Sequence, residues 1–101
     1  MSSEKEERPV PPGKGLDLDR FVNRLVLWKR PDDVVTLKNP TRQLPLTAVV
    51  CANGRADLLA KLIKAGATHS LTEAFRYALR YDAQECVAVL EGAGVKPPQI
   101  V

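Results

Sequence analysis

The feature that most constrains this chain is a helical pattern that recurs 28 positions further along it. Gly54 and Asp82 are 28 positions apart, and so are Gly66 and Gly94. The apolar positions between these markers coincide, with Leu58 over Cys86, Leu59 over Val87 and Leu62 over Leu90. A period of roughly 20–50 residues is typical of repeat architectures, in which each unit buries its apolar face against a neighbour. We therefore expect two consecutive structural units.

Each unit is predicted to be a pair of antiparallel helices joined by a tight turn. The apolar run Leu46–Ala52 is short enough to be a strand or a buried helix, but Asn53 and Gly54 follow it as a helix-stop signal. A second helix then runs to the next glycine. In the second unit, Thr72 is the expected N-cap and Tyr81-Asp82 marks the turn.

A further helix is predicted ahead of the two units. Its apolar positions recur at helical spacing: Leu18, Phe21, Val22, Leu25 and Trp28. Asp17 is the expected N-cap, and Pro31 ends the segment. Two repeats are fewer than a stable stack usually needs, so we expect this helix to cover the open face of the first unit. Phe21 and Trp28 are the bulky residues available for that seal.

The segment 31–45 contains three prolines, which exclude a continuous helix and favour an extended or hairpin-like finger. Aromatic residues make up only 5% of the chain, so the core is expected to be aliphatic. The predicted fold class is all-α, with residues 16–101 forming one helical domain. Residues 1–15 are polar, charged and rich in proline, and they are expected to form a flexible tail.

The stretch NGRADLLAKLIKAGA, residues 53–67, closely resembles the second half of an ankyrin repeat. Upstream, residues 44–48 resemble the Thr-Pro-Leu-His start of that repeat, with Leu44 and Thr47 in place of the usual Thr and His. The connector 68–71 is shorter than in the family, whose period is about 33 residues. The resemblance covers about residues 32–95 and implies a short ankyrin-like stack of helix pairs with a capping helix.

The resemblance also implies a function, because ankyrin repeats bind proteins through their finger tips and the exposed face of each first helix. The implied partner-binding residues are Lys38, Asn39, Thr41, Arg42 and Gln43 in the finger, and Thr47, Arg76, Tyr77 and Arg80 on the first helices. Tyr77 and Tyr81 either anchor a partner or simply line the groove. We therefore expect a non-enzymatic adaptor or inhibitor that binds a partner protein.

Nucleic-acid binding is the alternative function. The formal net charge is +3, and the excess lies between residues 20 and 43. The bases there are Arg20, Arg24, Lys29, Arg30, Lys38 and Arg42, against Asp32 and Asp33. Such a patch suits a phosphate backbone. Aromatic residues that would stack on bases are scarce, however, which favours a protein partner.

Catalytic chemistry is not expected. His69 is the only histidine, and Cys51 and Cys86 lie on apolar helix faces without metal-ligand spacing. We therefore expect no metal, no cofactor and no small-molecule substrate, with both thiols in the core. No signal peptide or membrane-spanning run is apparent, which predicts an intracellular protein, cytoplasmic or nuclear.

Two further possibilities stay open from the sequence. An open repeat face could be covered by a second copy of the chain, giving a homodimer. In the tail, the segment from Pro9 to Lys14 fits the PxxP pattern of polyproline ligands, although the same pattern is common in plain tails.

Overall fold

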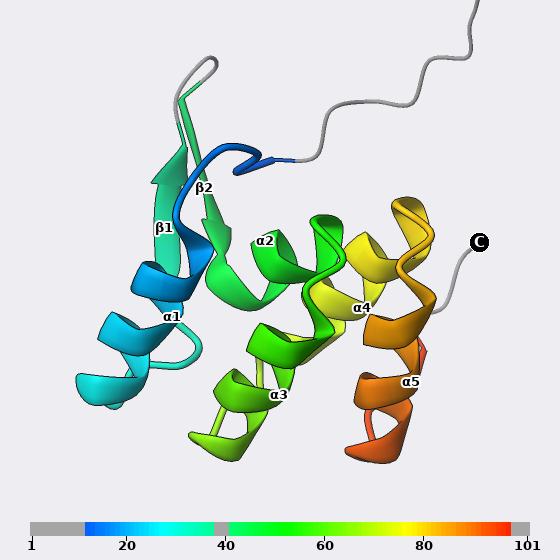
Figure 1. Ribbon diagram of the computed structural model, residues 1–101. Helices are drawn as coiled ribbons and strands as arrows, with labels where there is room; N and C mark the ends of the chain where they lie inside the picture. The colour runs from blue at the N-terminus through cyan, green and yellow to red at the C-terminus, as the bar shows by residue number, and fades with distance from the viewer. Residues whose placement is uncertain (1–11, 38–40, 98–101) are drawn as a thin grey trace, which may run out of the picture.

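The structure is a computed structural model, and it describes residues 12–37 and 41–97. Within these residues the chain forms five helices and two strands (Figure 1). Their bounds are α1 Leu18–Leu27, β1 Val34–Leu37, β2 Arg42–Pro45, α2 Leu46–Ala52, α3 Ala56–Lys64, α4 Leu71–Arg80 and α5 Gln84–Gly92.

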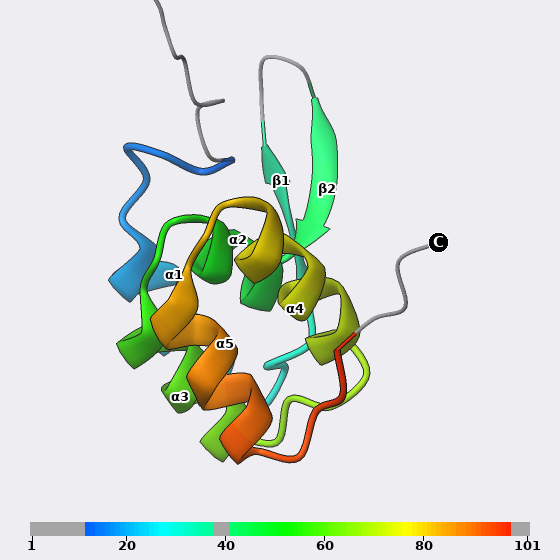
Figure 2. The same ribbon diagram turned by 90° about the vertical axis from the view of Figure 1, so that its right-hand side faces the viewer.

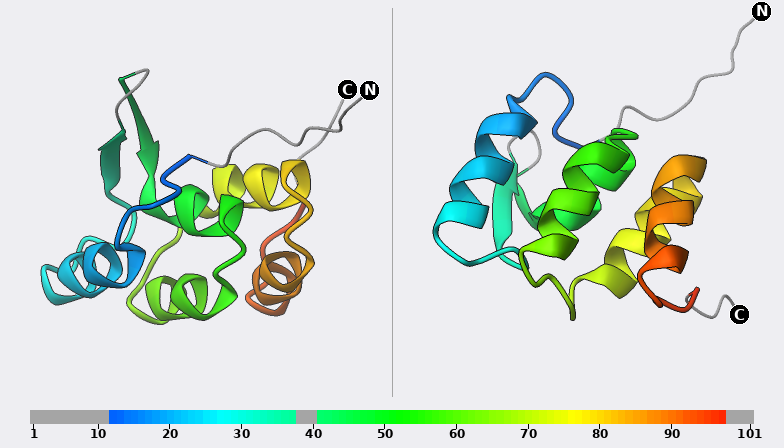
Figure 3. Two further views of the ribbon diagram at one scale, coloured as in Figure 1. Left: turned by 45° about the horizontal axis from the view of Figure 1, so that its top comes forward. Right: turned by 60° about the horizontal axis from the view of Figure 1, so that its bottom comes forward.

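The helices form two rows. Helix α3 lies between α1 and α5 and contacts both, and these three make one row (Figures 1 and 3). Helices α2 and α4 pack on each other in the second row, and each of them also packs on the helix that follows it, α3 or α5. Figure 2 faces the end of the molecule formed by α4 and α5, with α4 to the upper right of α5 and the hairpin at the top.

The prediction of an all-α fold is wrong, because β1 and β2 pair as a two-stranded antiparallel sheet. Val34 pairs with Pro45, and Leu37 pairs with Arg42. The fold is therefore α/β, with five helices and one small sheet in the described part of the chain. β-branched residues favour the extended backbone of β1, and the prolines exclude helix. The hairpin-like shape predicted for this finger is confirmed.

The 28-residue period is confirmed in the backbone. The turn inside each helix pair has a residue with positive φ, Gly54 at 71° and Asp82 at 57°. In both turns a backbone amide donates to the carbonyl five residues before it. Arg55 N–H donates to Val50 O at 2.9 Å, and Ala83 N–H donates to Ala78 O at 2.7 Å. Such bonds satisfy carbonyls that a helix end leaves without partners. The two pairs are therefore built by the same local interactions.

Helix α1 ends in the same way as α3 and α5. Lys29 has a φ of 59°, and Arg30 N–H donates to Leu25 O at 2.8 Å. The corresponding bonds, from Ala67 to Leu62 and from Val95 to Leu90, are both 3.0 Å. The N-cap predicted for α1 is confirmed, since the carboxylate of Asp17 accepts from Arg20 N–H at 3.2 Å. Helix α1 therefore corresponds to α3 and α5, and residues 12–17 before it contain no helix that corresponds to α2 or α4.

The core is aliphatic, as predicted, and it is centred on α2, all seven residues of which are buried. The prediction that Trp28 seals this core is wrong. Helix α1 ends at Leu27, and the Trp28 side chain is 57% exposed at the C-cap. The predicted N-cap of α4, Thr72, is also wrong, because the helix begins at Leu71 and Ser70, two residues earlier, occupies the cap position.

Residues 12–16 form turns that contact α2. Residues 12–15 belong to the tail predicted from the sequence. The carbonyl of Pro12 accepts a hydrogen bond of 2.8 Å from Asn53 Nδ2. Gly13 has a φ of 81°, and a Cβ added there would lie 2.6 Å from Val49 Cγ1. This segment thus packs on α2 and the turn that follows it. Residues 1–11, the rest of the predicted tail, lie outside the described residues.

We predict that Gly13→Ala destabilises the chain more than Gly15→Ala does. Both glycines have positive φ, which costs a side chain about 1–2 kcal/mol. Only Gly13 also meets a neighbour, since nothing lies within 4 Å of a Cβ at Gly15. Urea unfolding followed by circular dichroism compares the two variants. Equal loss of unfolding free energy would contradict the packing of this segment on α2.

Candidate protein-interaction surface

Helix α4 exposes a stripe of arginine and tyrosine side chains. Arg76 and Arg80 are exposed and Tyr77 and Tyr81 are half-buried. Within each pair the residues are four positions apart, so they lie on adjacent turns of one face. Arg76 Nη1 lies 3.9 Å from Glu73 Oε1, at the start of the same stripe. We call these five residues the α4 surface.

The two tyrosines form a stacked pair. Their ring centroids are 6.2 Å apart, and the ring planes differ by 13°. Tyr81 also borders a hollow of about 300 Å³ together with Lys14 and Asn53, so it lies on the side of α4 that faces α2 and the N-terminal turns. The stacking fixes both rings before any partner binds, which lowers the entropic cost of using them as contacts.

Helix α4 itself is held rigidly by its opposite face. Leu71, Ala74, Phe75 and Ala78 are buried against the rest of the core. Phe75 is the largest of the fully buried side chains. The α4 surface is therefore presented on a helix that packing fixes in place.

The structure does not gather the nine predicted binding residues in one place. Thr41, Arg42 and Gln43 are exposed on the hairpin, as a finger tip requires. Helix α2 lies between the hairpin and α4, however, so the hairpin residues are separate from the α4 surface (Figure 3). Lys38 and Asn39 lie outside the described residues. Among the described members of the predicted set, Arg76, Tyr77 and Arg80 lie together on α4, apart from the three hairpin residues.

Thr47 has to be removed from the predicted binding set, because it is fully buried. Its hydroxyl donates to the Oγ of Ser70 at 2.9 Å and lies 3.4 Å from the carbonyl of Ser70. The other residues of α2 are buried as well, so this helix offers no contact to a partner. Thr47 is instead a structural residue that joins α2 to the connector before α4.

Thr47 belongs to a network that sequence reasoning missed, centred on the carboxylate of Asp32. Backbone N–H groups of Thr68 and Ser70 donate to it at 3.0 and 3.1 Å. The Ser70 hydroxyl also donates to Asp32, which explains why it does not cap α4. Burial raises the pKa of Asp32, but the hydrogen bonds from Ser70 and Thr68 outweigh it, so the pKa lies below its usual range. His69 Nδ1 adds a contact of 3.5 Å.

The described residues contain no cluster that could hold a metal ion. No group of three or more His, Cys, Asp or Glu side chains gathers there. Cys51 and Cys86 are both buried and free. A hydrogen bond with Cys86, together with burial, raises the pKa of the Cys51 thiol, which opposes formation of a reactive thiolate. No helix among residues 12–37 and 41–97 has the length and apolar character needed to cross a membrane.

The predicted basic patch divides between elements. Arg20 and Arg24 lie on α1, whereas Arg42 lies on β2. Arg30 Nη1 lies 3.7 Å from Asp33 Oδ2, which neutralises part of the charge in the loop after α1.

Comparisons of this chain with protein-family models, with curated proteins and with solved structures give no match. The functional argument therefore rests on the residues and their geometry.

We predict that Asp32→Asn lowers the unfolding free energy at pH 7 by about 1–3 kcal/mol, because the amide cannot accept all the bonds that the carboxylate accepts. The folded-state pKa is lowered, so this stabilisation is present above the unfolded pKa of about 4 and is lost as pH falls through the folded pKa. The difference between native chain and variant should therefore shrink in acid. Urea unfolding at several pH values measures it.

Asp33→Asn is the matched control. Among the described residues the Asp33 side chain forms only an exposed ion pair with Arg30, and such pairs contribute less than about 1 kcal/mol. Equal stability of the two variants at pH 7 would contradict the structural role of Asp32.

Proposed function

We propose that this chain is a non-enzymatic protein-interaction module, an adaptor or inhibitor, that binds a partner protein through the α4 surface. One observation carries the proposal. Two exposed arginines and a half-buried, stacked tyrosine pair lie along one face of a helix whose other face is anchored in the core. Arginine and tyrosine are among the residue types that dominate the energetics of protein interfaces.

The charge of this surface indicates the chemistry of the partner. Arg76 and Arg80 each present a planar fork of donors that matches a carboxylate. Glu73 pairs with Arg76 only at 3.9 Å and on the exposed surface, so a partner carboxylate can compete for this arginine. A partner segment that combines acidic side chains with an apolar group for the tyrosines fits best.

The resemblance to ankyrin repeats stays a prediction and belongs to this proposal, since it is what places binding on the first helix of each pair. The exposed hairpin residues Thr41, Arg42 and Gln43 are a second contact region in the proposal. An intracellular location, cytoplasmic or nuclear, belongs to it as well. The two free buried thiols support that location, because reducing compartments keep thiols unpaired.

We predict that Tyr77→Ala combined with Arg80→Glu abolishes capture of a specific polypeptide by the immobilised chain. The double change removes one ring of the stacked pair and reverses one charge, which should weaken binding at least about a hundredfold if these residues are hot spots. The measurement is affinity capture from nuclease-treated extract, followed by direct binding of the identified polypeptide to the native chain and the variant.

Lys64→Glu is the control, because Lys64 is equally exposed but lies on α3. Arg42→Glu tests the hairpin separately. Capture that survives the α4 double variant would contradict the proposed surface. Capture from untreated extract that is lost in nuclease-treated extract would instead favour nucleic-acid binding, which stays a prediction.

A further inference from the structure

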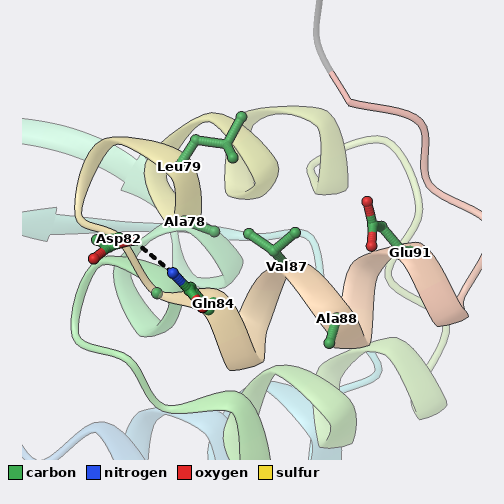
Figure 4. Close-up of a pocket in the computed structure, with 8 residues that line it drawn as sticks. Ala78, Leu79, Asp82, Gln84, Val87, Ala88 and Glu91 are labelled. Atoms are coloured by element: carbon green, nitrogen blue, oxygen red, sulfur yellow. Dashed lines mark hydrogen bonds between the residues drawn. The ribbon is translucent and has the colours of Figure 1, made fainter.

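The last helix pair has an uncovered apolar side. It forms a hollow of about 340 Å³ between α4 and α5 (Figure 4). We call this side the α4–α5 end face and define it by Leu79, Asp82, Gln84, Val87, Ala88 and Glu91. In Figure 4 the side chain of Val87 points from α5 toward α4, and Leu79 lies on α4.

The internal repeat shows what kind of surface this is. Cys51 and Leu59 stand 28 positions before Leu79 and Val87. Both are fully buried, because α4 packs on α2 and α5 packs on α3. In the second pair, by contrast, Leu79 is 43% exposed and Val87 is half-buried. The end face is therefore a helix-packing surface that nothing in the described residues covers.

The charge of the end face limits what can cover it. Asp82 and Glu91 are both exposed, and no lysine or arginine lines the hollow. If two copies met symmetrically through this face, carboxylates would face carboxylates without a compensating base. Like charges across an interface are unfavourable, so a twofold pairing is disfavoured. The cover should instead be apolar and basic.

The opposite end of the same chain has that character. Arg20, Arg24 and Trp28 lie four residues apart along α1, and the Arg24 guanidinium carbon lies 5.8 Å from the Trp28 ring centroid. Asp19 forms an ion pair of 3.3 Å with Arg55 at the start of α3, so its side of α1 faces α3. Successive residues of a helix are 100° apart around its axis, so Arg20, Arg24 and Trp28 lie on a different side of α1 from Asp19 and away from α3. We call this stripe the α1 outer face.

We propose that copies of the chain associate head to tail, the α1 outer face of one copy packing on the α4–α5 end face of the next. Arg20 and Arg24 then meet Asp82 and Glu91, while Trp28 adds apolar area. Helix α1 of the second copy extends the row of α1, α3 and α5 by one helix. Because the two surfaces differ, the contact is heterologous, and association continues into longer chains unless it closes into a ring.

Sedimentation velocity of the full chain over a concentration series, at low and high salt, tests this proposal. The native chain should form species larger than a dimer, and salt should weaken them because the contact pairs opposite charges. Arg24→Glu and Glu91→Arg should each weaken association roughly tenfold, and the combined variant should restore it. Lys64→Glu on α3 should leave it unchanged. Matching circular-dichroism melts confirm that each variant is folded.

A mixing experiment separates head-to-tail contact from symmetric pairing. Arg24→Glu damages only the α1 outer face, and Leu79→Lys damages only the end face. At a concentration just sufficient for the native chain to associate, each variant alone should be largely monomeric, and the mixture should form a dimer that grows no further, since one intact pair of surfaces remains. A native chain that stays monomeric at every concentration would overturn the proposal. A dimer that Arg24→Glu leaves intact would overturn it too.

Discussion

The hydrogen-bonded carboxylate of Asp32 fixes the second helix pair relative to the first part of the chain. It accepts from the amides of Thr68 and Ser70, and Ser70 in turn bonds Thr47 of α2. Three segments distant in sequence thus meet at one polar cluster: the loop after α1, the start of α2 and the connector before α4. Without the carboxylate, the amides of Thr68 and Ser70 would lose their hydrogen-bond acceptor, and the free energy of unfolding would fall. This cluster and the buried face of α4 together position the α4 surface and the end face.

Much of the helical framework could be predicted because its signals are local. The N-cap at Asp17 and the stops at Gly54 and Gly66 each depend on residues within one turn of the helix end. The 28-residue period likewise follows from comparing two stretches of sequence. The small sheet was missed as part of the fold class, because four-residue strands flanked by prolines carry little periodicity.

The site was predicted only in part, because contacts between distant residues leave no local signal. Arg76, Tyr77 and Arg80 were found from the position of α4 in its repeat. Thr47 was placed on the surface in error, since its burial depends on Ser70, which lies 23 positions away. Asp32 and Ser70 are 38 positions apart, and nothing in either neighbourhood indicates the bond. Trp28 fits the apolar spacing of α1, but the helix ends before it and the side chain turns outward.

The central claim is that the Asp32 cluster holds the connector in place, so native-state hydrogen exchange of the Thr68 and Ser70 amides tests it most directly. Both amides lie outside regular helix, yet both donate to the carboxylate. The structure predicts protection comparable to that of Ala74 in α4, whose amide donates to the carbonyl of the N-cap residue Ser70. Exchange of Thr68 and Ser70 at the rate of an unprotected loop would contradict the account, because α4 would then lack its anchor.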